Sequence, residues 1–98
     1  MRDKLIIEHI KNNNVGVFEA IFKEYFKPLA VFANQYVSDM DLAQDITQEI
    51  FIKKYEKKND LVIHTSLKSF LYVAAKNKCL DYLRSAKVRK KHKDHIIK

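Results

Sequence analysis

Apolar side chains recur every three or four residues along most of this chain. In one stretch they occupy Phe18, Ile21, Phe22, Tyr25 and Phe26, which is the spacing of a single face of an α-helix. Strands would need alternating apolar and polar residues, and the turns between short strands would need more than the one glycine and one proline present. The spacing therefore predicts an all-α fold.

Polar breaks divide the first half of the chain into two predicted helices. A short helix is expected over residues 4–12, with Asp3 as its cap, because the asparagine run at 12–14 favours a turn. A longer second helix is expected from near Gly16. Within it, Pro28 should cause a kink or start a new first turn, because proline lacks a backbone donor and crowds the preceding turn.

The second half of the chain predicts two more helices and one long loop. A third helix should run from the polar break at 38–41 to about residue 57. Residues 57–66 then read as a loop, which is long for a compact bundle and therefore hints at function. The last helix should run from Leu67 to at least Ser85.

The whole chain is expected to form one domain. Its 98 residues suffice for a single compact bundle of about four helices, in which residues 1–12 contribute a short N-terminal helix. Residues 85–98 are predicted to be a basic tail that frays and begins a linker.

Charge is distributed unevenly along the chain. Residues 1–60 carry nine Lys/Arg and ten Asp/Glu, whereas residues 61–98 carry ten Lys/Arg and only two Asp/Glu. The net charges of these parts, −1 and +8, make up the +7 of the chain. This asymmetry predicts that the second part meets a polyanion while the first part does something else.

The chain shows the features of a cytoplasmic protein without a membrane segment. Cys79 is its single cysteine, so no intrachain disulfide is possible, and a reducing compartment fits. The apolar run Leu5–Ile7 near the N-terminus is too short for a signal peptide or a membrane span. We therefore expect a cytoplasmic location and no contact with a membrane.

The third predicted helix has two apolar faces. At about 100° per residue, Leu42, Ala43, Ile46 and Ile50 fall on one side. The other side carries a mixture of acidic, amide and apolar groups: Asp45, Gln48, Glu49, Phe51, Ile52 and Tyr55. Two interpretations stand: a central helix packed on both sides, or a helix whose second face docks a partner protein.

The last predicted helix combines aromatic and basic residues. Phe70, Val73, Asn77 and Arg84 form a stripe on it. Aromatic rings can stack on bases, cations can meet phosphates and an amide can read a base edge, so the helix is equipped to hold single-stranded or melted DNA. The alternative is a solvated basic helix whose aromatic rings lie in the core. The basic run at 87–93 would add sequence-independent phosphate binding.

Signals of an enzyme are absent from the sequence. We find no glycine-rich phosphate loop, no nucleophile elbow and no cluster of cysteine and histidine with metal-ligand spacing. We therefore predict a binding module that needs no cofactor or metal.

Three blocks of residues resemble bacterial sigma factors. Residues 39–58 (DMDLAQDITQEIFIKKYEKK) look like the helix of that family that binds core RNA polymerase. Residues 66–85 (SLKSFLYVAAKNKCLDYLRS) resemble the helix that melts and reads the −10 promoter element, and residues 18–29 match the family's first helix. Three blocks in the right order are specific, and together they fit the extracytoplasmic-function group.

The resemblance implies two partners, with the contact residues carried over by position. Core polymerase would be contacted through the clamp coiled coil of its largest subunit by Asp45, Gln48, Glu49, Phe51, Ile52 and Tyr55. The non-template single strand of the −10 element would be contacted by Asn59, His64, Ser66, Lys68, Phe70, Tyr72, Lys76, Asn77 and Arg84. In the family, the loop before the last helix holds a flipped-out base, and an inhibitory anti-sigma factor is a frequent further partner.

The chain also departs from the family pattern. Phe70 stands where many members have tryptophan, and Val73 stands where many have arginine. The chain ends where the family's linker begins, and a complete member would continue into a helix-turn-helix domain that reads the −35 element. The chain is therefore expected to be about half of such a protein.

Two other functions compete with this interpretation. A helical protein-interaction adaptor, whose basic tail serves only solubility, would have no specific affinity for DNA. A small nuclease would need carboxylates that converge from separate elements, and none are evident in the sequence.

Overall fold

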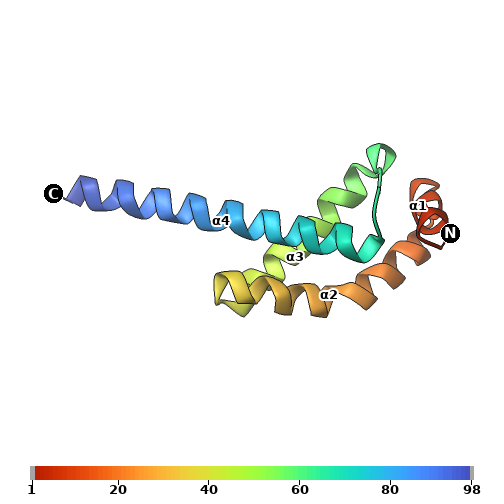
Figure 1. Ribbon diagram of the computed structural model, residues 1–98, viewed down its shortest axis with the longest axis horizontal. Helices are drawn as coiled ribbons and strands as arrows, with labels where there is room; N and C mark the ends of the chain where they lie inside the picture. Colours follow the sequence, from red (N-terminus) through yellow and green to blue (C-terminus); the bar gives the residue numbers. More distant parts are fainter. Residues whose placement is uncertain (1, 98) are drawn as a thin grey trace.

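The structure, a computed structural model, describes the backbone of residues 2–97 and the side chains of residues 3–86. Within that part of the chain every regular element is helical, which confirms the predicted all-α fold (Figure 1). The elements are α1 (Arg2–Lys11), α2 (Val15–Val37), α3 (Met40–Glu56), the short 3-10 helix η1 (Lys58–Asp60) and α4 (Leu67–Ile97).

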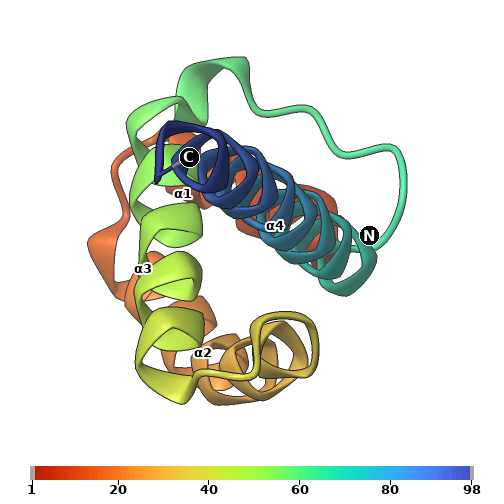
Figure 2. The same cartoon turned by 90° about the vertical axis from the view of Figure 1, so that its left-hand side faces the viewer.

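The helices form a bundle from which one helix projects. α2 packs against both α3 and α4, and α1 lies at the end of the bundle where α4 begins (Figures 1 and 2). The C-terminal part of α4 extends beyond the other helices. The backbone of the predicted fraying tail is thus helical as far as Ile97, while the side chains of 87–98 lie outside the described residues. Across residues 2–97, no helix is both long and apolar enough to cross a membrane.

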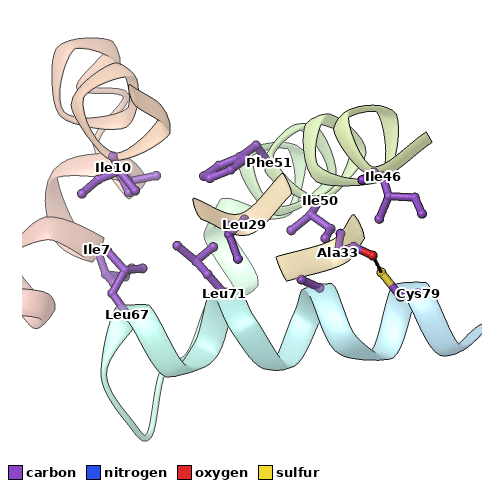
Figure 3. Close-up of a cluster of buried hydrophobic side chains, with 13 residues drawn as sticks. Ile7, Ile10, Leu29, Ala33, Ile46, Ile50, Phe51, Leu67, Leu71 and Cys79 are labelled. Atoms are coloured by element: carbon purple, nitrogen blue, oxygen red, sulfur yellow. Dashed lines mark hydrogen bonds between the residues drawn. The ribbon is translucent and has the colours of Figure 1, made fainter. Parts of the chain in front are cut away.

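Small side chains allow the helices of the bundle to approach closely. Ala33 on α2, Ala43 on α3 and Ala75 on α4 are all completely buried. Leu29 and Leu71 fill the space between these contacts (Figure 3). Burial of this apolar surface is the main source of the stability of the fold.

Pro28 does not interrupt α2. The helix continues from Val15 to Val37 with Pro28 inside it, so the alternative of a new first turn is wrong. Proline cannot donate to the carbonyl of Glu24, four residues earlier. Both Glu24 and Pro28 are exposed, so water can reach that carbonyl and the cost of the missing bond is limited.

Asparagine and aspartate cap the two central helices. The Asn14 side chain accepts a hydrogen bond from the Val17 N–H (3.2 Å), and Asp39 accepts one from the Leu42 N–H (3.2 Å). Ser38, in contrast, ends α2 with a left-handed backbone (φ 53°). The cap of α3 is therefore Asp39, because Ser38 already serves the preceding helix.

Asp3 does not have the role expected of it. Arg2 is already helical, so Asp3 lies inside the first turn of α1 and is not its cap. Its carboxylate instead accepts a hydrogen bond from the Leu67 N–H at the start of α4 (2.8 Å). A tertiary contact therefore replaces the predicted local cap.

Cys79 is expected to be unreactive in the folded chain. Its side chain is completely buried, its Sγ lies 3.8 Å from the Ala33 carbonyl oxygen, and burial raises the pKa of the thiol (Figure 3). Burial blocks access to the sulfur, and the raised pKa lowers the fraction of thiolate. A disulfide reagent should therefore label native Cys79 at least about tenfold more slowly than the unfolded chain. Labelling at equal rates with and without denaturant would contradict this placement.

Candidate nucleic-acid interface

A cavity of about 430 Å³ lies between α3, α4 and the segment that joins them. Four lysines line it, two on α3, one at the end of α3 and one on α4: Lys53, Lys54, Lys57 and Lys78. Three carboxylates, those of Glu49, Asp60 and Asp81, line it as well. We call this cavity the lysine groove. Residues 3–86 hold no cluster of His, Cys, Asp and Glu that could bind a metal ion.

Phe70 and Asn77 both line the lysine groove. They lie two turns apart on α4, so their side chains leave the helix on nearly the same side. The Phe70 ring is half-buried, with the Lys54 Nζ 5.1 Å from its centre. Asn77 is exposed, and its amide forms no hydrogen bond within the described residues. An aromatic surface, an unpaired amide and several cations therefore occupy one site.

Glu49 connects the two helices that form the groove. Its Oε1 lies 2.8 Å from the Lys53 Nζ on α3 and 3.2 Å from the Lys78 Nζ on α4. Hydrogen bonds from Lys53 and Lys78 lower the pKa of Glu49, and the bond to Glu49 raises the pKa of Lys53. All three groups are partly or largely exposed, so the pairs contribute little stability. Their main effect is to occupy two lysines of the groove.

Replacing Glu49 by glutamine should strengthen the binding of single-stranded DNA. Without the carboxylate, Lys53 and Lys78 are free to meet phosphates, so affinity should rise about threefold and the salt dependence should steepen by about one phosphate contact. Fluorescence anisotropy at several salt concentrations measures both quantities.

The matched control is Glu24→Gln, which removes the same charge from an exposed position on α2 and leaves the groove untouched. If both variants gain equally, the effect is one of net charge, and Glu49 does not restrain the lysines.

Several predicted DNA residues lie on the other flank of α4. Tyr72 packs against Phe32 of α2, with ring centres 4.9 Å apart, and the Lys68 Nζ lies 6.0 Å from the Tyr72 ring. Lys76 is exposed and, like these two, does not line the lysine groove. The structure therefore does not bring Lys68, Tyr72 and Lys76 together with Phe70 and Asn77.

Arg84 lies beyond the groove along α4. Its guanidinium is exposed and forms an ion pair with Asp81, which lines the groove. The predicted contact of Arg84 with a phosphate would therefore compete with this exposed pair, which costs little to break.

The loop residues named from the sequence lie outside the lysine groove. Asn59 is exposed in η1, and His64 lines a second cavity of about 760 Å³ between α1 and residues 61–65. The Ser66 hydroxyl accepts a hydrogen bond from the Ser69 N–H (3.0 Å), so it serves as a cap of α4. The part of the loop that does line the groove is Asp60 to Val62.

The second face of α3 is smaller than the sequence suggested. Phe51 is only 2% exposed, because the rings of Phe22 (5.1 Å between centres) and Phe18 (6.3 Å) cover it. The prediction that Phe51 contacts a partner is therefore wrong. Tyr55 is half-buried against Phe18, with ring centres 4.5 Å apart.

What remains exposed on that face is a compact set of three residues. Asp45 and Gln48 are exposed, and Ile52 beside them is 49% exposed although it is apolar. We call Asp45, Gln48 and Ile52 the docking face. Glu49 lies between the docking face and the lysine groove, and its carboxylate is engaged on the groove side.

The sequence did not single out the lysines of α3. Lys53, Lys54 and Lys57 stand in a part of the chain that is neutral overall, and they join a cationic site only because α4 packs beside them. Lys78 was recognisable only as one of several basic residues on α4. The last turn of α3 does carry a lysine pair that could serve as a local signal. Such cations are common at helix ends, where they complement the helix dipole, so the pair does not by itself indicate a binding site.

Comparisons with known proteins agree on one family. The family model described as Sigma-70 region 2 matches residues 21–89. A probable RNA polymerase sigma factor from Haemophilus influenzae is 32% identical over 56 residues, which is 57% of this chain and 29% of that protein. The structure is also similar to an engineered region 2 of sigmaE solved by NMR in complex with GTAAAA, with a TM-score of 0.74, 26% identity and coverage of 91% of this chain and 93% of the other. The matched part of the chain thus spans less than a third of the Haemophilus protein.

Proposed function

The chain belongs to the Sigma-70 region 2 family, and we propose that it binds core RNA polymerase and the melted −10 element of promoters during transcription initiation. The observation that carries this proposal is the lysine groove, in which Phe70 and Asn77 share one cavity with four lysines. The likeness to a region 2 of sigmaE in complex with GTAAAA supports a single strand of DNA as the ligand and membership of the extracytoplasmic-function group.

Each component of the groove has a distinct task in binding a melted strand. Phe70 offers a ring on which a base stacks, and Asn77 offers an amide that can donate to and accept from a base edge. The lysines meet phosphates and supply affinity that is independent of sequence. A base inside a duplex cannot reach the ring or the amide, so the groove favours unpaired DNA.

Polymerase would bind on a different side of α3. The docking face offers an exposed apolar residue, Ile52, flanked by the polar Asp45 and Gln48, which is the composition of a small interface core with its rim. We assign to it the clamp coiled coil of the largest subunit. An inhibitory anti-sigma factor would act by covering either this face or the groove.

No catalytic step is needed for this function. Binding energy from the groove is released only when the strand is unpaired, and this difference favours the open promoter. The chain would act as a binding module in the cytoplasm, where its polymerase and DNA are.

The experiment is a comparison of three labelled oligonucleotides by fluorescence anisotropy. They are a single strand containing GTAAAA, a scrambled single strand and the duplex of the first. The first should bind most tightly, and its affinity should fall linearly with log salt between about 50 and about 200 mM. Equal affinity for all three would contradict base capture, and no binding at physiological salt would favour a protein-interaction adaptor.

A further inference from the structure

A carboxylate from the first turn of the chain caps the helix that carries Phe70 and Asn77. Asp3 Oδ2 accepts a hydrogen bond from the Leu67 N–H at 2.8 Å, across 64 residues of sequence and in a partly buried position. The Leu67 N–H belongs to the first turn of α4, where backbone donors have no partner inside the helix. A carboxylate at this place satisfies such a donor and interacts favourably with the helix dipole.

Apolar contacts hold α1 where this hydrogen bond requires it. Ile7 and Ile10 are buried on the side of α1 that faces the bundle, and Leu67, which is 5% exposed, belongs to the same apolar cluster. Figure 3 shows Ile7 next to Leu67 at the start of α4. Because several buried side chains fix the position of α1, the Asp3 carboxylate is held next to its donor.

Residues 61–66, which lead into α4, form a segment shared by two cavities, and we call this segment the wall. Leu61 and Val62 line both the lysine groove and the second cavity beside α1. At one end the wall is anchored by the Leu61 N–H, which donates to the Lys58 carbonyl (3.2 Å). At the other end it runs into Leu67, whose N–H is the donor to Asp3. Residues 61–66 have no regular secondary structure, so these anchors determine where the wall stands.

We propose that Asp3 is a positioning residue for DNA recognition, and that α1, which precedes the residues matched by the family model, is a working part of the site. The inference rests on the proposed function of the lysine groove. Asp3 touches no DNA; it holds the start of α4 and the wall so that a base seated by Phe70 meets a closed pocket. The lysines are not held by this contact, so phosphate binding does not depend on it.

If base recognition depends on Asp3 and phosphate binding does not, loss of Asp3 should affect two DNA strands differently, which a purely structural role would not predict. Loss of the cap should weaken binding of the GTAAAA strand about fivefold, while binding of an oligo(dT) strand of equal length should not weaken. The sign is informative. Removing an acidic residue from a basic domain otherwise strengthens DNA binding, so a fall in affinity cannot come from the change of charge.

The test uses three variants of the full chain, each checked by circular dichroism for helix content. Asp3→Ala should lower affinity for the GTAAAA strand but not for oligo(dT), and it should speed hydrogen exchange of the Leu67 amide, followed by NMR, about fivefold. Asp3→Asn keeps a carbonyl oxygen that can accept the bond, so it should restore most of both losses. Glu8→Ala, an exposed carboxylate on the same helix, is the charge control and should cause neither loss.

Separate outcomes overturn the two levels of the proposal. If the unmodified chain binds GTAAAA no better than a scrambled strand, the proposed function fails. If it does bind selectively but Asp3→Ala keeps that selectivity, or if Asp3→Asn loses as much as Asp3→Ala, the positioning role of the Asp3 hydrogen bond fails. If Asp3→Ala loses its helix content, hydrogen exchange of the Leu67 amide is measured on the unmodified chain instead. A Leu67 amide that exchanges without protection there would equally refute the cap.

Discussion

Replacing Phe70 by alanine is expected to lower the affinity of the chain for a GTAAAA single strand between about 5-fold and about 150-fold, because stacking of one base on an aromatic ring contributes about 1–3 kcal/mol. The ring is half-buried in the lysine groove and already lies close to a cation, the Lys54 ammonium. It is therefore held in one position before DNA arrives, and little ordering is needed on binding. Anisotropy titration with the labelled strand gives the ratio of the two affinities.

The control for this variant is Phe32→Ala. Phe32 is also a partly buried ring, but it packs against Tyr72 on the other flank of α4 (4.9 Å) and against Tyr36 on its own helix, α2 (5.4 Å). Both variants lose a ring from the edge of the core, so both should lose comparable stability, but only Phe70→Ala should lose DNA affinity. Equal losses of affinity would show that the binding defect follows from weakened folding. A Phe70→Trp variant should bind at least as tightly as the unmodified chain, because the larger ring offers more stacking area.

The second large effect is expected at the docking face. Ile52→Lys should weaken binding to the isolated clamp helices of the polymerase about 30-fold, which corresponds to the loss of one interface hot spot of about 2 kcal/mol. A buried ammonium without a partner replaces an apolar contact there, and the exposed position of Ile52 means that the fold itself tolerates the change. A pull-down gives the direction, and titration calorimetry gives the magnitude.

Val31→Lys on α2 is the matched control, because Val31 is 45% exposed where Ile52 is 49% exposed. It should leave polymerase binding unchanged. Ile52→Lys should also leave DNA affinity intact or slightly raised, since the docking face and the lysine groove lie on different sides of α3. Unchanged binding of the clamp helices by Ile52→Lys would refute the assignment of the docking face.

Helical periodicity was sufficient to predict the four α-helices but not η1, and the reason is local. The stripe from Phe18 to Phe26 determines one face of α2. Asn14 and Asp39 mark the starts of α2 and α3, because their side chains accept hydrogen bonds from backbone N–H groups three residues later. The two apolar faces of α3 were likewise real. What periodicity cannot supply is the neighbour that covers each face. Phe51 therefore falls on the predicted docking side of α3 although the rings of Phe18 and Phe22 bury it.

The uneven distribution of charge along the chain could be predicted from the sequence, but the lysine groove could not. The sequence predicted a basic C-terminal part and placed Phe70 and Asn77 on one stripe, because residues seven apart lie on nearly the same side of a helix. It assigned no DNA contact to Lys53 or Lys54, since their part of the chain is neutral overall. Only the packing of α3 beside α4 brings these lysines to Phe70.

The sequence by itself therefore determined the all-α fold, the order of the helices, the family and the residues that share a face of one helix. All of these follow from interactions within a few residues or from matching strings. Tertiary structure alone decided which face meets solvent, which lysines surround the ring, and that Asp3 caps a helix 64 residues away. The physical reason is that contacts between helices depend on the packing of whole surfaces, and no short stretch of sequence contains that information.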